Sequence, residues 1–354
     1  MKRSILTFLA GSIAMLAGCN SNDQEAVALP YWTFSAEMVF PADQSLDRCE
    51  DGVVLADGRL IVTDQTSGLR LVNADGSSRP FGKFAEAGYV HNPPEVEGCV
   101  NGSSLTPDGT HILVADVFRG GIYQVEIATE ATEQVYQHPF GINTARMDSR
   151  GGIWFSQSTE NLPHEGKGGL FRTVDVRKPD GAVFYISPAG PNGQREAVKV
   201  VDGLYFANGL ALDEINGFLY VAECMASKVL RFRIDVETGQ VFEKTVVTEI
   251  NIPDNLELDD EGRLWIASPM LTGIFVYDPA AEVTENVFRI SSLESEALIE
   301  EANQRIANGT PWLDLMIPEL WSPAPGLVTG MILSPDGGPV YVTGLGKALI
   351  RLER

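Results

Sequence analysis

Cysteine, histidine and basic residues are all scarce in this chain of 354 residues, which has 4 cysteines and 4 histidines. Four cysteines are too few for a disulfide-stabilised scaffold. Lysine and arginine number 26 against 48 aspartates and glutamates, and the formal net charge is −22. A surface of this charge repels phosphate backbones, so we expect no nucleic-acid partner. With 44% hydrophobic residues, 35 glycines and 20 prolines, the composition also excludes a coiled coil, a collagen-like repeat and a disordered chain.

Long apolar runs are absent after the first eighteen residues. Lys2 and Arg3 precede an apolar run over residues 5–16, which is too short for a permanent transmembrane helix. The run leads through Leu-Ala-Gly to Cys19, an arrangement that resembles the lipobox of bacterial lipoproteins, in which the cysteine is lipidated. An ordinary secretory signal peptide is the alternative. We therefore predict a lipoprotein signal peptide over 1–18, a lipidated cysteine and tether over 19–29, and one folded domain over 30–354.

The lipobox resemblance implies a location in the bacterial cell envelope, with membrane contact through the lipid anchor. Asn20 stands where an aspartate is associated with inner-membrane retention, which favours the outer membrane, facing the periplasm. Such a compartment is oxidising. Cys49 and Cys99 occupy nearly equivalent places in neighbouring repeats, so the sequence leaves open either a disulfide between them or three unpaired buried thiols, Cys224 being the third.

Six copies of one pattern fill the rest of the chain. Each begins with a polar residue, continues with alternating apolar residues and passes through an Asp-, Gly- and Asn-rich turn into a second apolar strand, as antiparallel hairpins do. The copies start at residues 50, 101, 143, 208, 254 and 329. Four strands per copy fit the blades of a propeller, whereas an α/β fold would need helices between the strands. We therefore predict an all-β, six-bladed β-propeller.

Two insertions interrupt the repeats. Residues 291–325 lie between the fifth and sixth blades, and Ser291 and Glu294 have the spacing of a capping box, so one helical insertion is expected there. This insertion would pack on the edge of a blade or form a lid or wall over the channel mouth. Residues 157–169, in the third blade, are expected to form a loop near one mouth.

The first residues of the six repeats are expected to form a polar ring around the channel axis. They are Glu50 with Asp51, Asn101, Asn143, Asn208, Asp254 with Asn255, and Thr329. Converging carboxylate and amide oxygens suit a hard cation such as Ca²⁺, with Mn²⁺ or Mg²⁺ as alternatives. Because the ring lacks histidine and cysteine, zinc and copper are disfavoured. A polar channel that merely holds water is the competing interpretation.

The ring residues resemble those of a known superfamily. Four match, blade by blade, the pattern of the senescence-marker-protein, gluconolactonase and luciferin-regenerating enzyme superfamily: Glu50, Asn143, Asn208 and Asp254. The phrases Phe-Ala-Asn-Gly over 206–209 and Pro-Asp-Asn-Leu over 253–256 are similar to paraoxonase-like and strictosidine-synthase-like motifs. The resemblance covers the whole predicted propeller domain through short motifs.

This resemblance implies a calcium-dependent hydrolase of lactones or activated esters, acting on a small molecule at the channel mouth. It implies the following cation ligands: Glu50, Asn143, Asn208, Asp254 and Asn255. A bound divalent ion polarises the substrate carbonyl, and a neighbouring carboxylate acts as base or nucleophile. We predict that Asp254 combines ligand and catalytic roles, and that Asn101 hydrogen-bonds the substrate.

Several features depart from the relatives. Paraoxonases have a histidine at the position of Asn101 and an aspartate for a second calcium at the position of Thr144, so their histidine dyad does not transfer and a second ion stays open. No equivalent of the catalytic glutamate of strictosidine synthases is found. His138 or His164 would serve as a proton carrier only if it approached the mouth. The alternative function is a lipid-anchored, non-catalytic propeller that binds a sugar, a peptide or an envelope partner.

Overall fold

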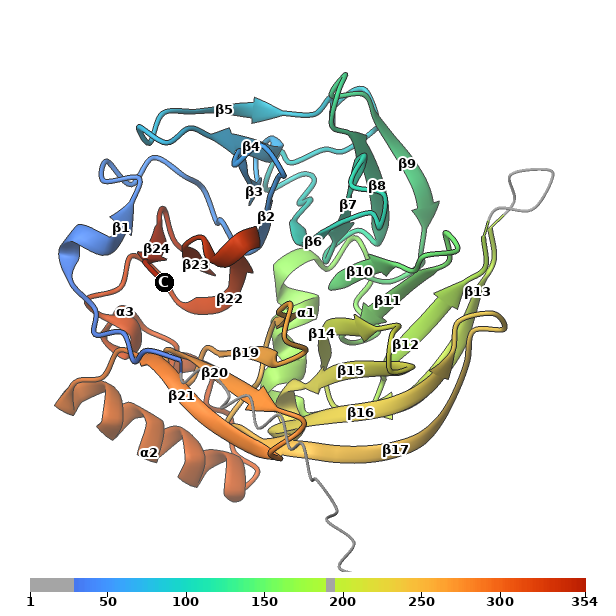
Figure 1. Cartoon of the computed structure of the whole chain (residues 1–354). Helices are drawn as coiled ribbons and strands as arrows, with labels where there is room; N and C mark the ends of the chain where they lie inside the picture. The colour runs from blue at the N-terminus through green and yellow to red at the C-terminus, as the bar shows by residue number, and fades with distance from the viewer. Residues whose placement is uncertain (1–28, 189–194) are drawn as a thin grey trace, which may run out of the picture.

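Each of the six repeats folds into a four-stranded antiparallel sheet, and the sheets stand radially around one axis (Figure 1). The computed structural model describes residues 29–188 and 195–354. The predicted six-bladed β-propeller is therefore confirmed. The predicted signal peptide and Cys19 lie outside the described residues.

The first three blades follow the chain from the innermost strand outward. Blade one consists of β2 (Gly52–Val54), β3 (Leu60–Asp64), β4 (Gly68–Val72) and β5 (Ser78–Phe81). Blade two consists of β6 (Val100–Leu105), β7 (His111–Asp116), β8 (Gly121–Glu126) and β9 (Thr132–Gln137). Blade three consists of β10 (Thr144–Met147), β11 (Ile153–Gln157), β12 (Gly181–Ile186) and β13 (Ala197–Leu204).

The next two blades repeat this order, and the sixth differs. Blade four consists of β14 (Ala207–Asp213), β15 (Phe218–Glu223), β16 (Lys228–Asp235) and β17 (Gln240–Glu249). Blade five consists of β18 (Leu256–Leu258), β19 (Leu264–Ser268), β20 (Gly273–Asp278) and β21 (Val283–Arg289). Blade six consists of β22 (Val328–Leu333), β23 (Val340–Gly344), β24 (Leu349–Leu352) and, as its outer strand, β1 (Val39–Phe40).

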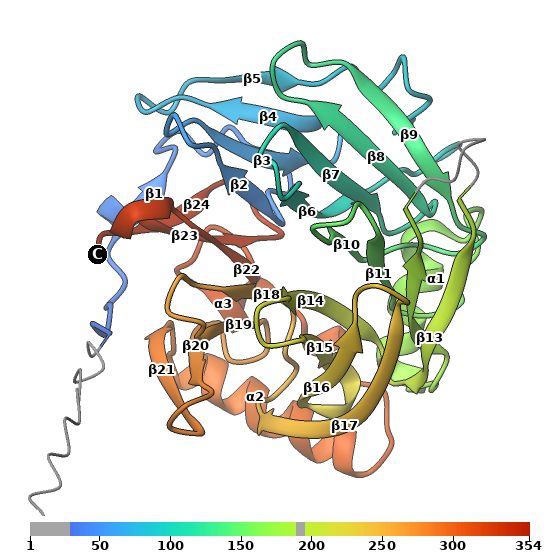
Figure 2. The ribbon, with the colours of Figure 1, turned by 45° about the vertical axis from the view of Figure 1, so that its right-hand side comes forward.

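The two ends of the propeller domain close the ring together. Strand β1 pairs with β24 in antiparallel register, Val39 opposite Ile350, and the two lie side by side in Figure 2. A short 3₁₀ turn, η1 (Ala36–Met38), leads into β1. Nearby, Trp32 Nε1 donates a hydrogen bond of 2.7 Å to the carbonyl oxygen of Glu353. The closed ring leaves no innermost strand without a neighbouring blade.

Apolar side chains between adjacent blades form the core. The second strand of each blade is buried on both faces, as in β11 and β19, where every residue is buried. Outer strands such as β17 are mostly exposed and carry charged residues. Burial therefore decreases from the second strand to the outer strand of a blade. The charged side chains on the exposed outer strands hinder pairing with strands of other chains.

The predicted helix between blades five and six is α2 (Leu293–Ala307). Its cap is one residue later than predicted. Ser292, which has extended backbone angles, is the N-cap, and its hydroxyl accepts from Ser295 N while Ser295 Oγ accepts from Ser292 N. The capping box is thus Ser292 with Ser295, not Ser291 with Glu294. The insertion continues through η3 (Leu313–Leu315) and α3 (Pro318–Trp321).

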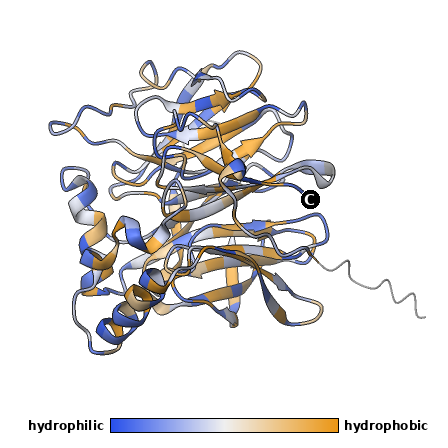
Figure 3. Ribbon diagram, turned by 90° about the vertical axis from the view of Figure 1, so that its left-hand side faces the viewer, coloured by the Kyte–Doolittle hydropathy of each residue, from blue (hydrophilic) through white to orange (hydrophobic). Residues whose placement is uncertain are grey.

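The expected loop in blade three is wrong in its second half, where helix α1 (Gly166–Val176) begins. Its glycine-rich start hides the helical pattern, but Leu170 and Val174, four residues apart, are buried on one face. Figure 3 shows the helices gathered on one face of the propeller. Two further 3₁₀ turns, η2 (Cys224–Ala226) and η4 (Pro335–Gly337), complete the elements. Within the described residues, no helix has the length and apolar character needed to span a bilayer.

The described cysteines form no disulfide, and neither His138 nor His164 lines the cavity at the channel mouth. Cys49, Cys99 and Cys224 are all buried and unpaired. His138 is buried among aromatic rings, including Phe155 and Phe184, and does not line the channel mouth. His164 is exposed.

Candidate active site

The polar ring lies at the bottom of one cavity of about 80 Å³, on the face that carries the helices. One residue of the polar ring from each blade lines this cavity: Glu50, Asn101, Asn143, Asn208, Asp254 and Thr329. Each stands at or just before the start of an innermost strand. The predicted convergence of the six repeat starts is therefore present in the structure.

Backbone hydrogen bonds between neighbouring blades hold the ring together. Gly102 N donates to Asn143 O at 2.9 Å, and Asn255 N donates to Thr329 O at 3.0 Å. The glycines after Asn101 and Asn208 permit this approach. A Cβ atom on Gly209 would lie 2.6 Å from Asp254 O, closer than carbon and oxygen can pack. The Asn-Gly pairs in the sequence are thus required by contact between innermost strands.

Glu50 is the most constrained acid of the ring. Its side chain is buried, and Oε1 accepts a hydrogen bond of 3.1 Å from Asn255 Nδ2. Oε2 has no hydrogen-bond partner in the described part of the chain. Asn255, a predicted ligand, does not line the cavity and instead directs its amide nitrogen to Glu50. The amide nitrogen of Asn255 therefore positions Glu50, while ligation by Asn255 stays a prediction.

Asp51 is turned away from the cavity. Its Oδ1 accepts from Gly52 N at 2.8 Å and its Oδ2 accepts from Ser103 N at 2.7 Å, so its carboxylate joins blade one to blade two. Further along the channel, Arg146 donates to Leu210 O at 3.1 Å and forms an ion pair with Glu257. Glu50 therefore lines the cavity, whereas the adjacent Asp51 stabilises the contact between two blades.

The three asparagines differ in how much of each side chain remains available. Asn101 Nδ2 lies 3.3 Å from both Asn143 O and Asn143 Oδ1, and Asn143 Nδ2 donates to Ser158 Oγ at 3.1 Å. Asn143 Oδ1 keeps one further acceptor position. Asn208 Oδ1 is buried without a partner among the described residues. Two ring oxygens, Glu50 Oε2 and Asn208 Oδ1, therefore lack the hydrogen bonds that buried polar atoms normally have.

The electrostatics of the ring favour an added positive charge. Burial raises the pKa of Glu50, and the neighbouring Asp254 raises it further, whereas the Arg48 guanidinium acts in the opposite direction. Burial also raises the pKa of Asp254. Two buried carboxylates resist ionising together unless a proton or a cation compensates them.

The donor set fits a hard divalent cation. Within the described ranges no three His, Cys, Asp or Glu side chains form a metal-binding group. A cation in this cavity would draw on the carboxylates of Glu50 and Asp254 and on the amide oxygens of Asn143 and Asn208. Calcium accepts such mixed oxygen ligands and irregular geometry. The unpartnered Glu50 Oε2 and Asn208 Oδ1 are the observations that support this fit.

Arg48 is a site residue that sequence reasoning missed. It lines the cavity, and its guanidinium donates to Asn101 Oδ1 at 2.9 Å and to Val100 O at 3.1 Å. It belongs to no strand, and its backbone is in the left-handed region, with φ of 53°. The repeat pattern starts two residues later and therefore gave no signal for it. Both ends of the Asn101 amide are engaged, so Asn101 positions Asn143 and Arg48, and its contact with substrate stays a prediction.

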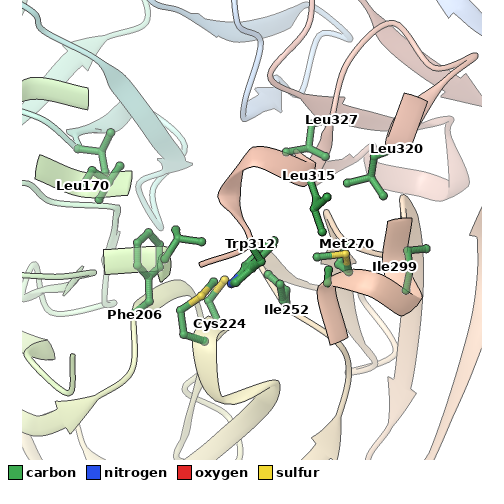
Figure 4. Close-up of a cluster of buried hydrophobic side chains, with 14 of the residues drawn as sticks. Leu170, Phe206, Cys224, Ile252, Met270, Ile299, Trp312, Leu315, Leu320 and Leu327 are labelled. Carbon is green, nitrogen blue, oxygen red and sulfur yellow. The ribbon is translucent and has the colours of Figure 1, made fainter. Parts of the chain in front are cut away.

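The walls of the cavity are apolar, and the two insertions supply much of them (Figure 4). Helix α1 contributes Leu170, Phe171 and Val174. The segment after α2 contributes Trp312, Leu313 and Met316. Blades four to six add Phe206, Met225, Ile252 and Leu327. Both arrangements predicted for residues 291–325 are present. Helix α2 packs on the edge of a blade, and residues 312–316 form part of the cavity wall.

A carboxylate joins the two insertions. Asp175 Oδ1, near the end of α1, accepts from Trp312 N at 2.8 Å and from Leu313 N at 3.0 Å. These bonds satisfy the free amide groups at the start of η3. The insertion over 291–325 was predicted from the sequence, whereas its partner α1 was not.

Comparisons with known proteins agree with the ring pattern. Residues 131–289 match the family model of the SMP-30/Gluconolactonase/LRE-like region. The resemblance predicted from the sequence is confirmed. A gluconolactonase from Xanthomonas campestris has 16% sequence identity, and the match covers 91% of this chain and 93% of that chain with a TM-score of 0.59. A calcium-binding protein, regucalcin, from Agrobacterium tumefaciens has 14% identity, with 89% and 86% covered and a TM-score of 0.54. At these identities the structures establish the common fold.

Sequence relatives match shorter stretches. Human serum paraoxonase/arylesterase 2 is 29% identical over 117 residues, which are 32% of this chain and 31% of that protein. Strictosidine synthase-like 10 of Arabidopsis thaliana is 32% identical over 84 residues, 23% of this chain and 21% of that protein. The chain thus aligns with less than a third of the length of these relatives. Both agree with the paraoxonase-like and strictosidine-synthase-like motifs found in the sequence.

Proposed function

We propose that this protein hydrolyses lactones or activated esters with apolar substituents, with the help of a divalent cation, expected to be Ca²⁺, at the polar ring. The observation that carries the proposal is a pair of buried carboxylates and two unpartnered oxygens beneath an apolar cavity. The family match, the gluconolactonase structures and the paraoxonase-like relative support a propeller of lactonase or esterase type.

Four residues would hold the cation: Glu50, Asn143, Asn208 and Asp254. When bound, such an ion polarises a substrate carbonyl and stabilises the negative charge that develops on its oxygen. The protein fixes the ligands beforehand. Asn255 holds one oxygen of Glu50, and Ser158 together with Asn101 fixes the amide of Asn143. Such preorganisation avoids reorganisation of the site during the reaction.

Asp254 is the residue we assign to proton transfer. It is 8% exposed against 2% for Glu50, so water reaches it more readily. In the proposed reaction, the oxygen of a water molecule forms a bond to the carbonyl carbon while Asp254 accepts a proton from that water. The bond between the carbonyl carbon and the ring or ester oxygen then breaks, and the proton passes to the leaving oxygen. A lactone gives a hydroxy acid, and an ester gives an acid and an alcohol.

The apolar walls narrow the substrate class. Leu170, Val174 and Met316 offer no hydrogen-bonding side chain to a substituent, whereas a sugar lactone carries several hydroxyl groups. Burying such hydroxyls without partners costs free energy. Alkyl or acyl substituents instead gain from leaving water. We therefore expect alkyl lactones and aryl esters to be better substrates than sugar lactones.

The test is hydrolysis of γ-decalactone, gluconolactone and phenyl acetate by the purified protein, with Ca²⁺ and with a chelator. We expect calcium-dependent turnover that favours γ-decalactone. Asp254→Asn should abolish it, while Asp260→Asn, an exposed acid of the same blade, should leave it unchanged. Full turnover in the chelator, or in Asp254→Asn, would contradict the proposal.

We also propose that the protein acts at the bacterial cell envelope, anchored through Cys19. The lipobox-like run before this cysteine supports the proposal. Mass spectrometry of the protein purified from membranes should find an acylated cysteine as its first residue. Cys19→Ser should move the protein from the membrane fraction to the soluble fraction, and unchanged partitioning would contradict the anchor.

A further inference from the structure

An arginine crosses the channel beyond the polar ring. Arg146 belongs to β10 of the third blade, and its Nε donates to Leu210 O of the fourth blade at 3.1 Å. Its Nη2 donates to Leu256 O of the fifth blade at 3.1 Å, and the guanidinium forms an ion pair with Glu257. The innermost strands of these blades, β10, β14 and β18, surround the channel in Figure 2. With its side chain 16% exposed, Arg146 is therefore fixed inside the channel by the backbone of two other blades.

The ion pair lies at the far end of the channel. Arg146 comes three residues after Asn143, and Glu257 comes three residues after Asp254. Because a strand rises about 3.3 Å per residue, the pair lies about 10 Å farther along the channel than the ring. Both residues line a second cavity, of about 410 Å³, together with later parts of innermost strands such as Val54. Within the described ranges, no residue lines both this cavity and the active-site cavity, so the ion pair faces the opposite mouth.

Asp51 lies between the ring and this ion pair. It follows Glu50 by one residue, is 2% exposed, and accepts hydrogen bonds from Gly52 N and Ser103 N. Burial raises the pKa of Asp51 well above its usual range, the charge of Glu50 raises it further, and the charge of Arg146 lowers it. A buried carboxylate resists ionising unless a positive charge compensates it. Arg146 is thus close enough to compensate Asp51 electrostatically.

The same part of the channel contains oxygen atoms of the kind that a second divalent cation would need. Ser103 Oγ is buried without a partner in the described part of the chain, and Ser103 N donates to the carboxylate of Asp51. Hard cations bind several such oxygens, carboxylates above all. A guanidinium is always charged, however, and it repels a cation placed near it. The fixed position of Arg146 therefore opposes a second cation beside Asp51.

We infer that the guanidinium of Arg146 takes the place of a second cation, so that the channel binds one divalent cation, at the polar ring. The inference rests on the proposed function, which supplies the cation at the ring, and it adds the number of ions and the residue that fixes this number. An arginine, unlike a bound ion, cannot dissociate from the chain. The channel beyond the ring therefore stays compensated when calcium is removed.

The first experiment counts the Ca²⁺ ions per chain by elemental analysis after equilibrium dialysis of the purified protein. The wild type should hold one Ca²⁺, which Asp254→Asn should remove. Arg146→Met should hold two, because Asp51 and Glu257 then lack their positive charge, and the second ion should disappear when Asp51→Asn is added. Arg150→Met, which removes an exposed arginine of the same blade, is the matched control and should hold one.

Thermal unfolding in a chelator gives a second readout. Arg146→Met should lower the Tm by at least about 5 °C, because removing one partner of a buried ion pair leaves the other charge uncompensated. Addition of Ca²⁺ should raise the Tm of Arg146→Met more than that of the wild type. If this variant fails to fold, Arg146→Met combined with Glu257→Leu replaces the whole pair with apolar side chains. The double variant still leaves Asp51 uncompensated, so it should also hold two Ca²⁺ ions.

The number of ions separates the possible failures. Two Ca²⁺ ions in the wild type, one of them lost in Asp51→Asn, would overturn the inference and leave the hydrolase function intact. A single ion in the folded Arg146 variants would also overturn it, because Asp51 would then need no positive charge beside it. Absence of Ca²⁺ from the wild-type ring would overturn the cation-dependent function, and the inference with it.

Discussion

The side-chain nitrogen of Asn255 lies 3.1 Å from Oε1 of Glu50, although the two residues are 205 positions apart in the sequence. The contact joins the fifth blade to the first across the channel. It commits one oxygen of Glu50 to the fold and leaves Oε2 unpartnered at the cavity floor. Asn255 therefore determines which oxygen of Glu50 is available to a cation.

Removing this contact should weaken cation binding. In Asn255→Ala, Glu50 loses the hydrogen bond that orients it, and loss of such a supporting contact typically costs about 10- to 100-fold in metal affinity. Isothermal titration of the cation-free protein with Ca²⁺ measures the change. Asn303→Ala, which removes an exposed amide pair with Asn251, is the control and should bind as the wild type does. Unchanged affinity in Asn255→Ala would show that Glu50 needs no such support.

The cation-free protein should become less stable as pH rises. Burial and the charge of Asp254 raise the pKa of Glu50 from 4.5 to about 8. The folded state thus retains a proton that the unfolded chain releases above pH 4.5, and this stabilising contribution is lost as pH rises toward 8. For this one group, the free energy of unfolding falls by at most about 1.4 kcal/mol per pH unit.

Thermal unfolding between about pH 5 and pH 8, in a chelator and in Ca²⁺, tests this dependence. The Tm should fall with pH in the chelator, and Ca²⁺ should remove most of the fall because it compensates the ionised carboxylates. Glu50→Gln, which cannot ionise, should show a weaker dependence in the chelator. The expected direction is wrong if the Tm of the cation-free protein rises with pH over this range.

The fold and the ring follow from local sequence signals. Each blade start combines a polar residue with a strand pattern, and glycine follows it in Asn101-Gly102 and Asn208-Gly209, where innermost strands approach closely. Because the same pattern repeats six times, the radial arrangement and the convergence of Glu50 with Asp254 could be inferred without any long-range information. The different directions of the neighbouring acids Glu50 and Asp51 could not be inferred, because Asp51 accepts a hydrogen bond from Ser103 N of the next blade.

The residues around the ring were harder to predict from the sequence, because contacts with distant residues determine their positions. Arg48 lies in an irregular segment, and its direction depends on Asn101 Oδ1 and Val100 O of another blade. Helix α1 begins with several glycines, which have weak helix propensity. Burial of Leu170 against other parts of the fold compensates this weakness of the helix. In both cases the deciding contacts come from residues far away in the sequence.

The bond between the two insertions should control access to the cavity. Asp175→Ala removes the acceptor for Trp312 N and Leu313 N and should loosen the wall. We expect kcat/KM for γ-decalactone to fall about tenfold or more, because small displacements of positioning groups have large effects on rate. Calcium affinity should stay unchanged, since Asp175 does not touch the ring. Asp175→Asn retains an acceptor oxygen and should keep most of the activity; equal losses in both variants would argue against this role.

Contact between innermost strands predicts a contrast between two glycine substitutions. Gly209→Ala places a Cβ atom 2.6 Å from Asp254 O and 2.6 Å from Leu256 N, both backbone atoms of the next blade. The strands must separate, so we expect a loss of about 1–3 kcal/mol in stability and weaker calcium binding, because Asp254 moves. Gly168→Ala, within α1, meets no atom within 4 Å and should stabilise the protein by up to about 1 kcal/mol. Chemical denaturation of both variants, each with and without Ca²⁺, measures the contrast. If Gly209→Ala were as stable as Gly168→Ala, the close approach of blades four and five would not be what holds Asp254 in the ring.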